Sequence, residues 1–245
     1  MVEISIKTIL SNIIISKTDK LNVSAIFLDD SIIIVDTGLS MDDVLPLKRY
    51  LAETFNCPIK YVFLTHSHMD HAGGMNALPE VEIICHLITA KKRRYKNVTK
   101  FQEKLVLKEN NHILEFYQLG GHTNDSSILF YKNKKVVFAG DLVIANYYPP
   151  YGGDRSCNPD TWLKALETIR DLKPEYIVPG HGEILDLNQF LGYIDYFNEF
   201  KMTLEQAFDK NLIYQEINIP KFGNLPKSER WASQTVKNWF RIFSE

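Results

Sequence analysis

The sequence of 245 residues predicts a mixed α/β sandwich. Three observations lead to this fold class. The chain opens with short Ile- and Val-rich segments separated by turn residues, its middle alternates apolar strands with helical segments, and its last quarter repeats aromatic residues at helical spacing. Hairpins and crossovers in one chain argue against an all-parallel, doubly wound sheet.

Short strands are predicted at the start of the chain, because these segments are rich in β-branched residues. Asp29 and Asp30 supply the turn between the last two. The predicted strands cover residues 4–10, 13–17, 24–28 and 32–35.

A helix follows these strands. Ser40 can cap its N-terminus, and Asp42 and Asp43 place negative charge in its first turn. Apolar residues then recur every three or four positions, as on one face of a helix: Val44, Leu47, Leu51 and Phe55.

The middle of the chain alternates further strands with helical or loop segments. The basic stretch 91–104 is expected to be a helical or loop excursion. Asn158 and Pro159 form a typical cap and first turn for a helix that carries Trp162. The strands are expected at residues 61–64, 81–85, 114–119, 127–131, 135–139 and 176–178.

The last quarter is expected to be helical, with a break near residues 201–203. Aromatic residues at this spacing are more typical of a core than of a cofactor site. The aromatic and apolar positions are Phe190, Ile194, Phe197, Leu204 and Phe208, then Trp231, Val236, Trp239, Phe240 and Phe243. Residues 1–245 are expected to form one domain, with a helical part from about residue 187.

Composition excludes several classes of function. The formal net charge is -2, which gives no basic excess for nucleic acid or an anionic membrane. The chain has no apolar run long enough to span a bilayer and no recognisable signal segment. Cys57, Cys85 and Cys157 are too few and too widely spaced for a disulfide framework, so we expect inert thiols in a cytoplasmic protein.

The most informative segment places three histidines and one aspartate within six residues: His66, His68, Asp70 and His71. Imidazole and carboxylate are the ligands that Zn²⁺ and similar divalent metals prefer. Crowded imidazoles without a metal have no packing benefit, so the segment predicts a metal site.

Three further candidate ligands occur in the same local context as this segment. His122, Asp141 and His181 each come just after a predicted strand and a glycine. Loops that follow neighbouring strands meet at one edge of a sheet, so these positions can converge. Five of the seven histidines of the chain lie in such contexts. His86 and His112 do not, and we expect them to be structural or surface residues.

In this order, Asp36-Thr37-Gly38, the segment His66 to His71, His122, Asp141 and His181 resemble the metallo-β-lactamase superfamily over about residues 24–185. The resemblance implies an αββα sandwich with a dinuclear metal site at one edge of the two sheets. Here it would carry a helical C-terminal extension.

The resemblance also implies a role for each site residue. His66, His68 and His122 would bind one metal, and Asp70, His71 and His181 the second. Asp141 would bridge both. Asp36 would fix a ligand loop or an imidazole by hydrogen bonding. The expected cofactor is two Zn²⁺, although iron or manganese would suit similar ligands.

This ligand set implies hydrolysis of a small molecule. Two cations about 3.5–4 Å apart can share a water and lower its pKa, and the hydroxide attacks a carbonyl or phosphorus. Asp70 would orient the nucleophile or transfer a proton. The expected substrate is a small ester, thioester, lactone or related amide. The alternatives are an iron-dependent oxidoreductase, such as a persulfide dioxygenase, or a phosphodiesterase on the same fold.

The loop after Asp141 offers candidate substrate contacts. Tyr147, Tyr148, Tyr151 and Arg155 lie among prolines and glycines, and aromatic side chains beside a metal could form a wall for an apolar substrate. A phenol could also donate a hydrogen bond to a developing oxyanion. The basic run 91–94 is expected to be a solvated face. The sequence leaves the oligomeric state open.

Overall fold

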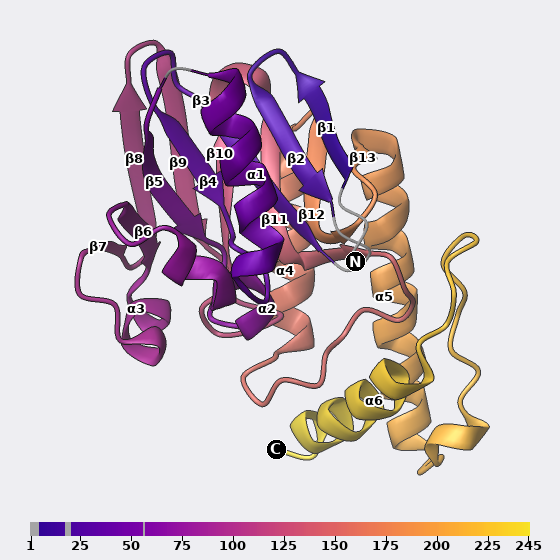
Figure 1. Cartoon of the computed structure of the whole chain (residues 1–245). Helices are drawn as coiled ribbons and strands as arrows, with labels where there is room; N and C mark the ends of the chain where they lie inside the picture. Colours follow the sequence, from indigo (N-terminus) through magenta and orange to yellow (C-terminus); the bar gives the residue numbers. More distant parts are fainter. Residues whose placement is uncertain (1–4, 18–20, 56) are drawn as a thin grey trace.

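The protein is described by a computed structural model that covers residues 5–17, 21–55 and 57–245. Two sheets pack face to face, and helices cover their outer faces (Figure 1). The predicted αββα sandwich is therefore confirmed. Ile4, which begins the first predicted strand, lies outside the described residues.

The first sheet follows the chain order, with antiparallel pairs from β1 to β4 and parallel pairs from β4 to β7. Its strands are β1 (Ser5–Leu10), β2 (Ile13–Lys17), β3 (Asn22–Phe27), β4 (Ile32–Val35), β5 (Ile59–Leu64), β6 (Glu82–His86) and β7 (Val98–Phe101).

The second sheet has the order β13-β12-β11-β10-β9-β8, and its only parallel pair among the described strands is β11 with β12. Its strands are β8 (Lys104–Glu109), β9 (His112–Gln118), β10 (Ser127–Tyr131), β11 (Val136–Ala145), β12 (Tyr176–Gly182) and β13 (Leu185–Asp186).

The helices flank the sheets and join the strands. They are α1 (Met41–Thr54), α2 (Met69–Ala72), α3 (Leu87–Arg93), α4 (Pro159–Asp171), α5 (Leu187–Asp209) and α6 (Glu229–Phe243). The sequence signals for their starts are confirmed in two cases. Ser40 and Asp43 form a capping box at α1, and the Asn158 side chain accepts a hydrogen bond from Thr161 N at 2.8 Å.

Three apolar clusters hold the layers together. The α1 face, including Val44 and Leu47, packs on the outer side of the first sheet. A second cluster with Phe63 and Phe116 fills the space between the sheets. The third joins the second sheet to α4, α5 and α6 and contains Trp162. Since most of the strands bury apolar side chains, the sheets give a rigid base for the loops at their shared edge.

Two predicted strand ends are wrong in a way that affects the site. β11 continues through Gly140 and Asp141, and β12 continues through His181, so these two ligands lie inside strands. The reason is that β11 and β12 remain paired beyond the expected ends, with register shifts on either side of Gly140. The shifts let the strands extend while the backbone turns the ligands toward the sheet edge.

The expected excursion over residues 91–104 is wrong in its second half. The helix α3 ends at Arg93, and Arg94 takes the left-handed conformation with φ of 59°. The segment then forms the edge strand β7, parallel to β6, and Lys104 begins β8. Of the four residues of β7, two are apolar (Val98 and Phe101) and two are polar, without alternation, so the sequence gives little strand signal for this short edge strand.

The expected break near residues 201–203 is also wrong, because α5 runs without interruption. No proline or glycine occurs in this stretch. The Lys201 ammonium instead lies 2.6 Å from Glu205 in the next turn and 2.9 Å from Asp160 on α4. These contacts fix α5 beside α4 at the position where a kink was expected.

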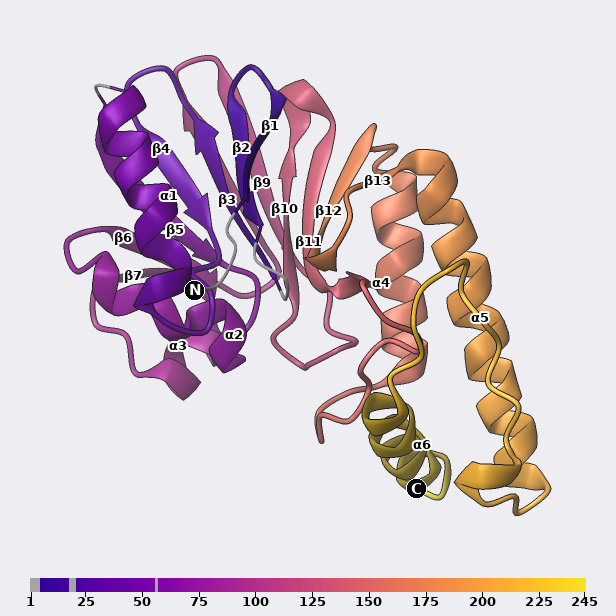
Figure 2. The same ribbon diagram turned by 45° about the vertical axis from the view of Figure 1, so that its right-hand side comes forward.

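The C-terminal helix returns to the body of the protein. Figure 2 shows α6 below α4 and beside the lower part of α5, after a long connection that runs up along α5 and back. Aromatic packing fixes this arrangement, because Trp239 lies against Phe197 and Phe200 of α5. Among the described residues, no helix is long and apolar enough to cross a membrane.

Candidate metal centre

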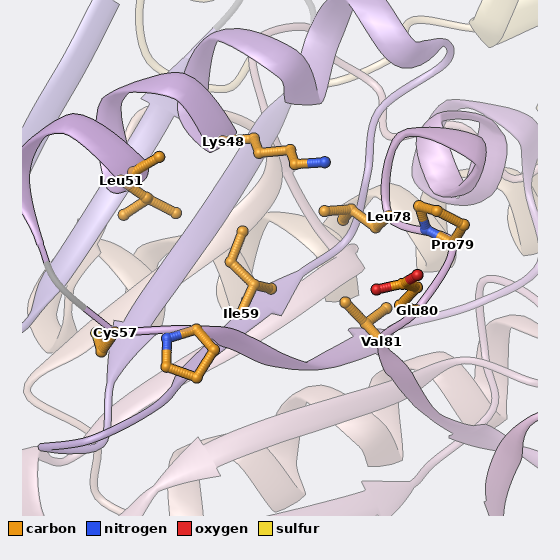
Figure 3. A pocket seen from close by; sticks show the side chains of 10 residues that line it. Lys48, Leu51, Cys57, Ile59, Leu78, Pro79, Glu80 and Val81 are labelled. Carbon is orange, nitrogen blue, oxygen red and sulfur yellow. The ribbon is translucent and has the colours of Figure 1, made fainter.

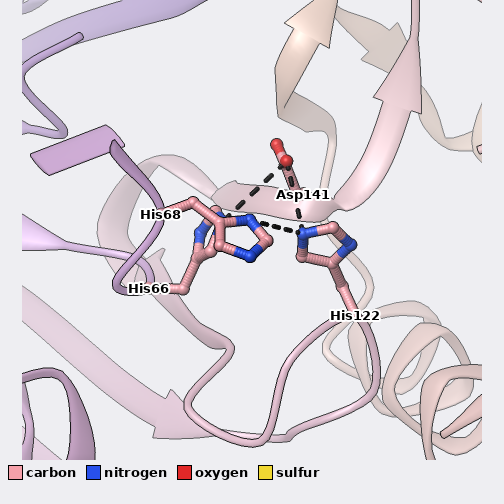
Figure 4. Close-up of side chains that lie close together, drawn as sticks. All are labelled: His66, His68, His122 and Asp141. Carbon is pink, nitrogen blue, oxygen red and sulfur yellow. Dashed lines mark hydrogen bonds and ion pairs between the residues drawn. The ribbon is translucent and has the colours of Figure 1, made fainter. Parts of the chain in front are cut away.

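The seven side chains predicted as metal ligands lie together at one edge of the sandwich. They form two groups that share one carboxylate, and the donor atoms within each group lie within 4.8 Å of one another. The first group, shown in Figure 4, is His66, His68, His122 and Asp141. The second is Asp70, His71, Asp141 and His181.

The backbone around Asp141 depends on a glycine. Gly140 has φ of 51°, and a Cβ atom there would stand 2.5 Å from the Thr65 hydroxyl oxygen. Only glycine combines this left-handed conformation with so close an approach. β11 therefore passes directly beside the histidine loop that follows β5, and Asp141 reaches both groups.

The histidine loop and the strand that carries His181 are both fixed by hydrogen bonds. The amide and hydroxyl of Thr37 donate to the carbonyl of His71 at 2.7 and 3.1 Å. The buried Asn22 amide donates to the carbonyls of Pro179 and Gly182, on either side of His181, at 2.9 and 3.0 Å. Segments of the first sheet therefore position ligands from both sheets.

The spacing of the donor atoms suits two separate cations. One oxygen of Asp141, Oδ2, lies 3.5 Å from His122 Nε2 and 3.9 Å from His66 Nε2. The other, Oδ1, lies 3.0 Å from His71 Nε2 and 3.3 Å from His181 Nε2. Ligands about 2.0–2.1 Å from a tetrahedral ion are separated from one another by about 3.3 Å. The observed separations scatter about that value.

The outward nitrogens of three imidazoles have partners that fix the rings. Nδ1 of His71 lies 2.7 Å from Asp36 Oδ2, and Nδ1 of His122 lies 3.0 Å from the Tyr151 carbonyl oxygen. Nε2 of His68 lies 3.0 Å from Asp154 Oδ2. Carbonyl and carboxylate oxygens accept, so each outward nitrogen is held as a donor. With a metal bound, the opposite nitrogens would be deprotonated and would offer their lone pairs to the ion.

Burial and neighbouring charges set the protonation states of the ligands. Burial lowers the pKa of His122 to about 4, and burial together with His71 lowers the pKa of His66 well below its usual value, so both stay neutral. For Asp141, burial is outweighed by His71 and His181, which hold its pKa well below the usual range. A carboxylate anion and neutral imidazoles are the states in which these groups bind metals.

The chemistry of this donor set fits divalent cations. His66 Nε2 is buried and makes no hydrogen bond within the described part of the chain. An orphaned buried polar atom costs about 1–3 kcal/mol. A cation between His66, His68, His122 and Asp141 would satisfy it. We therefore assign divalent metal binding to these side chains.

A cavity of about 310 Å³ opens directly onto the centre. Its lining combines polar ligands with an apolar side that includes Tyr151 and Trp231. Tyr151 belongs to the loop singled out in the sequence. Trp231 was expected in the core, and this interpretation is wrong because Trp231 stands in the first turn of α6, where the helix reaches the cavity.

The two other tyrosines predicted to bind substrate lie outside the lining. Tyr148 is 7% exposed and packs in the cluster under α5 and α6, and its backbone pairs with Pro226 and Ser228. Tyr147 is 40% exposed, and its ring meets the Trp231 ring edge-on. Their contact with substrate stays a prediction.

Sequence reasoning missed Asp154, which holds His68. A single aspartate in a Gly-rich loop carries no local signal, and only the folded chain brings it to the ligand. The two histidines outside the motifs lie elsewhere. His86 Nδ1 lies 3.4 Å from the amide of Ile88 at the start of α3, and His112 lies 3.2 Å from Asp29.

A second cavity, of about 340 Å³, lies between α1, the start of β5 and the segment 78–81 that precedes β6 (Figure 3). Its walls are mostly apolar, with Leu51, Ile59 and Val81 among them. Lys48, at its rim, donates to the Ala77 carbonyl at 2.8 Å. Neither group of clustered metal-ligating residues borders this cavity. The chemistry therefore points to the cavity at the metal centre.

Comparisons with known proteins agree with this geometry. Residues 18–181 match the family model of the "Metallo-beta-lactamase superfamily". A Beta-lactamase-like protein 2 homolog of Caenorhabditis elegans is 27% identical over 74% of this chain and 61% of that protein. A Metallo-beta-lactamase type 2 of Bacillus cereus is 29% identical over 67% of this chain and 68% of that protein.

The chain is also similar to a relative named as a thioesterase and to solved structures. Thioesterase pkgB of Emericella nidulans is 28% identical over 64% of this chain and 44% of that protein. The structure of a metallo-beta-lactamase from Pontibacter korlensis superposes with a TM-score of 0.70 at 20% identity, covering 80% of this chain and 99% of that one. By the family match and the shared architecture, this chain belongs to the metallo-β-lactamase superfamily.

Proposed function

We propose that the protein is a dinuclear zinc hydrolase that acts on a small ester, thioester, lactone or related amide. The observation that carries this proposal is the split of Asp141, whose two oxygens face two separate sets of imidazoles. A carboxylate placed in this way is suited to bridge two cations. The donor atoms are all nitrogen or oxygen, and this set suits zinc as well as iron.

The size of the cavity supports a small-molecule substrate. A volume of about 310 Å³ lies at the lower end of the range for ligand pockets. Relatives named as a β-lactamase and as a thioesterase both support cleavage of an acyl bond. The chain aligns with only part of the length of these proteins, so the substrate is proposed as a class and not as a compound.

The residues of the chain divide the reaction between them. When bound, the metal ions would supply a Lewis acid for the carbonyl oxygen and a water of lowered pKa. Asp70 is the ligand carboxylate most open to the cavity, with 38% of its side chain exposed, and Oδ2 lies 3.4 Å from His181 Nε2. It is placed to orient the attacking water and to accept its proton. Asp36 acts through a metal ligand, because its carboxylate holds the His71 ring by a hydrogen bond.

The apolar side of the cavity limits the access of bulk water. Ile144 is 1% exposed, and it lies in the lining together with Tyr151 and Trp231. Burial raises the pKa of the Tyr151 phenol above its ordinary value, so this group stays protonated at neutral pH. No Ser or Cys nucleophile is needed for the proposed reaction.

The test combines elemental analysis with a substrate panel. Protein purified without chelators is expected to hold close to two metal ions per chain and to hydrolyse at least one class among esters, thioesters, lactones and β-lactams. Removal of the metal should abolish turnover, and Zn²⁺ should restore it. Fully loaded protein that is inert across the panel would contradict the proposal. Oxygen uptake by iron-loaded protein, or cleavage of a phosphodiester, would favour one of the alternative reactions.

A further inference from the structure

The helix α6 lies outside the segment that matches the family model, and yet it contributes to the cavity. The match ends at residue 181, whereas α6 covers Glu229–Phe243. Trp231 in its first turn lines the cavity beside His181, with ring centroids 6.4 Å apart. The C-terminal region of this chain therefore adds a side chain of its own to the site.

Hydrogen bonds tie α6 to the loop that forms the adjacent part of the wall. The Gly152 amide donates to the Thr235 hydroxyl at 2.8 Å. The Asn238 amide donates to the carbonyls of Gly152 and Asp154 at 2.9 and 2.7 Å. Thr235 is fully buried and Asn238 almost fully buried. Buried, satisfied polar contacts of this kind fix geometry, so the loop and the helix hold their positions together.

The loop fixed in this way also contacts the metal ligands. The carbonyl of Tyr151 accepts a hydrogen bond from His122, and the carboxylate of Asp154 pairs with His68. The Tyr151 ring lies 6.0 Å from the Trp231 ring. The aromatic wall therefore stands at a set distance from the ions that the ligands would hold.

Several aromatic rings that pack on one another form the wall. Trp231 packs with Tyr151 and, edge-on, with Tyr147 at 5.4 Å. Met69 and Ile144 add further apolar atoms to the lining. Aromatic rings prefer offset-stacked or edge-to-face partners at centroid distances of about 4.5–7 Å, and sulfur also packs well on ring edges. A planar apolar group is the ligand chemistry that this wall fits best.

We infer that Trp231 and Tyr151 determine specificity by selecting substrates that carry a planar apolar group, such as an aryl ring, next to the scissile acyl bond. This inference rests on the proposed hydrolase function, because the metal centre defines where that bond lies. The ring can belong to the acyl part or to the leaving group. In both cases it packs against the Trp231 indole while the carbonyl faces the metal centre.

A binding experiment tests the wall without relying on turnover. Zinc-loaded protein is titrated calorimetrically with phenylacetate and with acetate, which differ by the ring alone. We expect phenylacetate to bind about tenfold more tightly, a preference that Trp231→Ala removes and Trp231→Phe largely keeps. Equal affinities in the wild type, or a preference that survives Trp231→Ala, would overturn the inference.

A kinetic experiment shows whether the ring is recognised on the acyl side or on the alcohol side of the ester. Methyl phenylacetate and benzyl acetate are isomers that carry the ring on the acyl side and on the alcohol side, and ethyl acetate carries none. For the preferred isomer, Trp231→Ala should lower kcat/KM about tenfold more than it lowers kcat/KM for ethyl acetate, and mainly through KM. The inference fails if Trp231→Ala affects all three esters equally. If no ester reacts, ester hydrolysis fails, and the binding experiment still decides on the wall.

The matched control is Phe240→Ala on the same helix. Phe240 is half-buried like Trp231, but its ring packs on Phe208 of α5. Phe240 does not line the cavity, so this variant removes packing from α6 without changing the wall. It should keep the preference for phenylacetate. Metal content and thermal unfolding, measured for every variant, identify any loss of preference that comes from a damaged centre.

Discussion

Nδ1 of His71 lies 2.7 Å from Oδ2 of Asp36, and both side chains are buried. The same carboxylate accepts hydrogen bonds from the Thr65 amide at 2.8 Å and from the Thr65 hydroxyl at 2.9 Å. One carboxylate therefore fixes both the start of the histidine loop and the ring of a ligand within it. This arrangement supports the positioning role that the sequence predicted for Asp36.

Asp36→Asn is expected to weaken binding of one of the two metal ions about 10- to 100-fold. The new amide group would face His71 with a donor and favour the tautomer whose proton occupies the metal-facing nitrogen. Asparagine tolerates the left-handed backbone of this position, where φ is 57°. Competition titrations with a chromophoric chelator measure the affinities. The exposed carboxylate of Asp195 on α5 supplies the control, Asp195→Asn, and equal affinities in both variants would refute this role.

Asp154→Asn should have the corresponding effect on the other metal ion. Asp154 Oδ2 lies 3.0 Å from His68 Nε2, and its Oδ1 accepts from the amide and hydroxyl of Ser156 at 2.8 and 2.6 Å. The asparagine keeps the contacts to Ser156 and presents a donor to His68. We expect a 10- to 100-fold loss of affinity at the first group, with the second group retained. A loss at both sites, or at neither, would contradict the assignment of Asp154 to His68.

The contrast between Asp36 and Asp154 shows how far sequence reasoning extends. Asp36 follows a buried strand and precedes Gly38, so local context marks it. The ligands themselves carry the same kind of signal, and the structure brings all of them together. Asp154 and Trp231 act only through tertiary contacts, since each reaches the centre from a segment with no chemical pattern of its own.

The errors in the fold have related physical causes. Lys201 interrupts the apolar stripe between Phe197 and Leu204, which favoured a break. Pairing of Lys201 with Asp160 on α4 and with Glu205 instead supports a continuous helix. Likewise, the parallel partner of β11 extends that strand beyond the last apolar residue before Gly140. Contacts between distant segments decided these ends, and no local propensity records them.

The reactivity of the three cysteine thiols should follow their burial, so it tests the fold and not the metal centre. Burial raises the pKa of Cys85 and of Cys157 to about 12, so the reactive thiolate is scarce at pH 8. Cys57 is partly exposed, and burial raises its pKa less. Native protein treated with a disulfide reagent at pH 8 should react first and mainly at Cys57. Guanidinium-unfolded protein should react at all three thiols, and rapid native modification of Cys85 or Cys157 would be inconsistent with their burial.

Asp141→Ala tests the bridging role directly. The substitution removes the oxygen that faces His66 and His122 and also the oxygen that faces His71 and His181. Both groups lose a donor, so the metal content should fall from about two ions to one or fewer per chain, and turnover should fall by at least about 10³-fold.

The fold itself should survive Asp141→Ala, because the clusters that join the layers do not include Asp141. Circular dichroism and thermal unfolding of the metal-free proteins check this point against Asp195→Ala. In the metal-free wild type, the carboxylate outweighs burial and raises the pKa of His181 to about 10. In the Asp141→Ala variant the His181 imidazole can stay neutral. The loss of the carboxylate therefore leaves no buried charge without its partner, which limits the loss of folding stability. A variant that keeps wild-type metal content and turnover would show that Asp141 does not bridge the two ions.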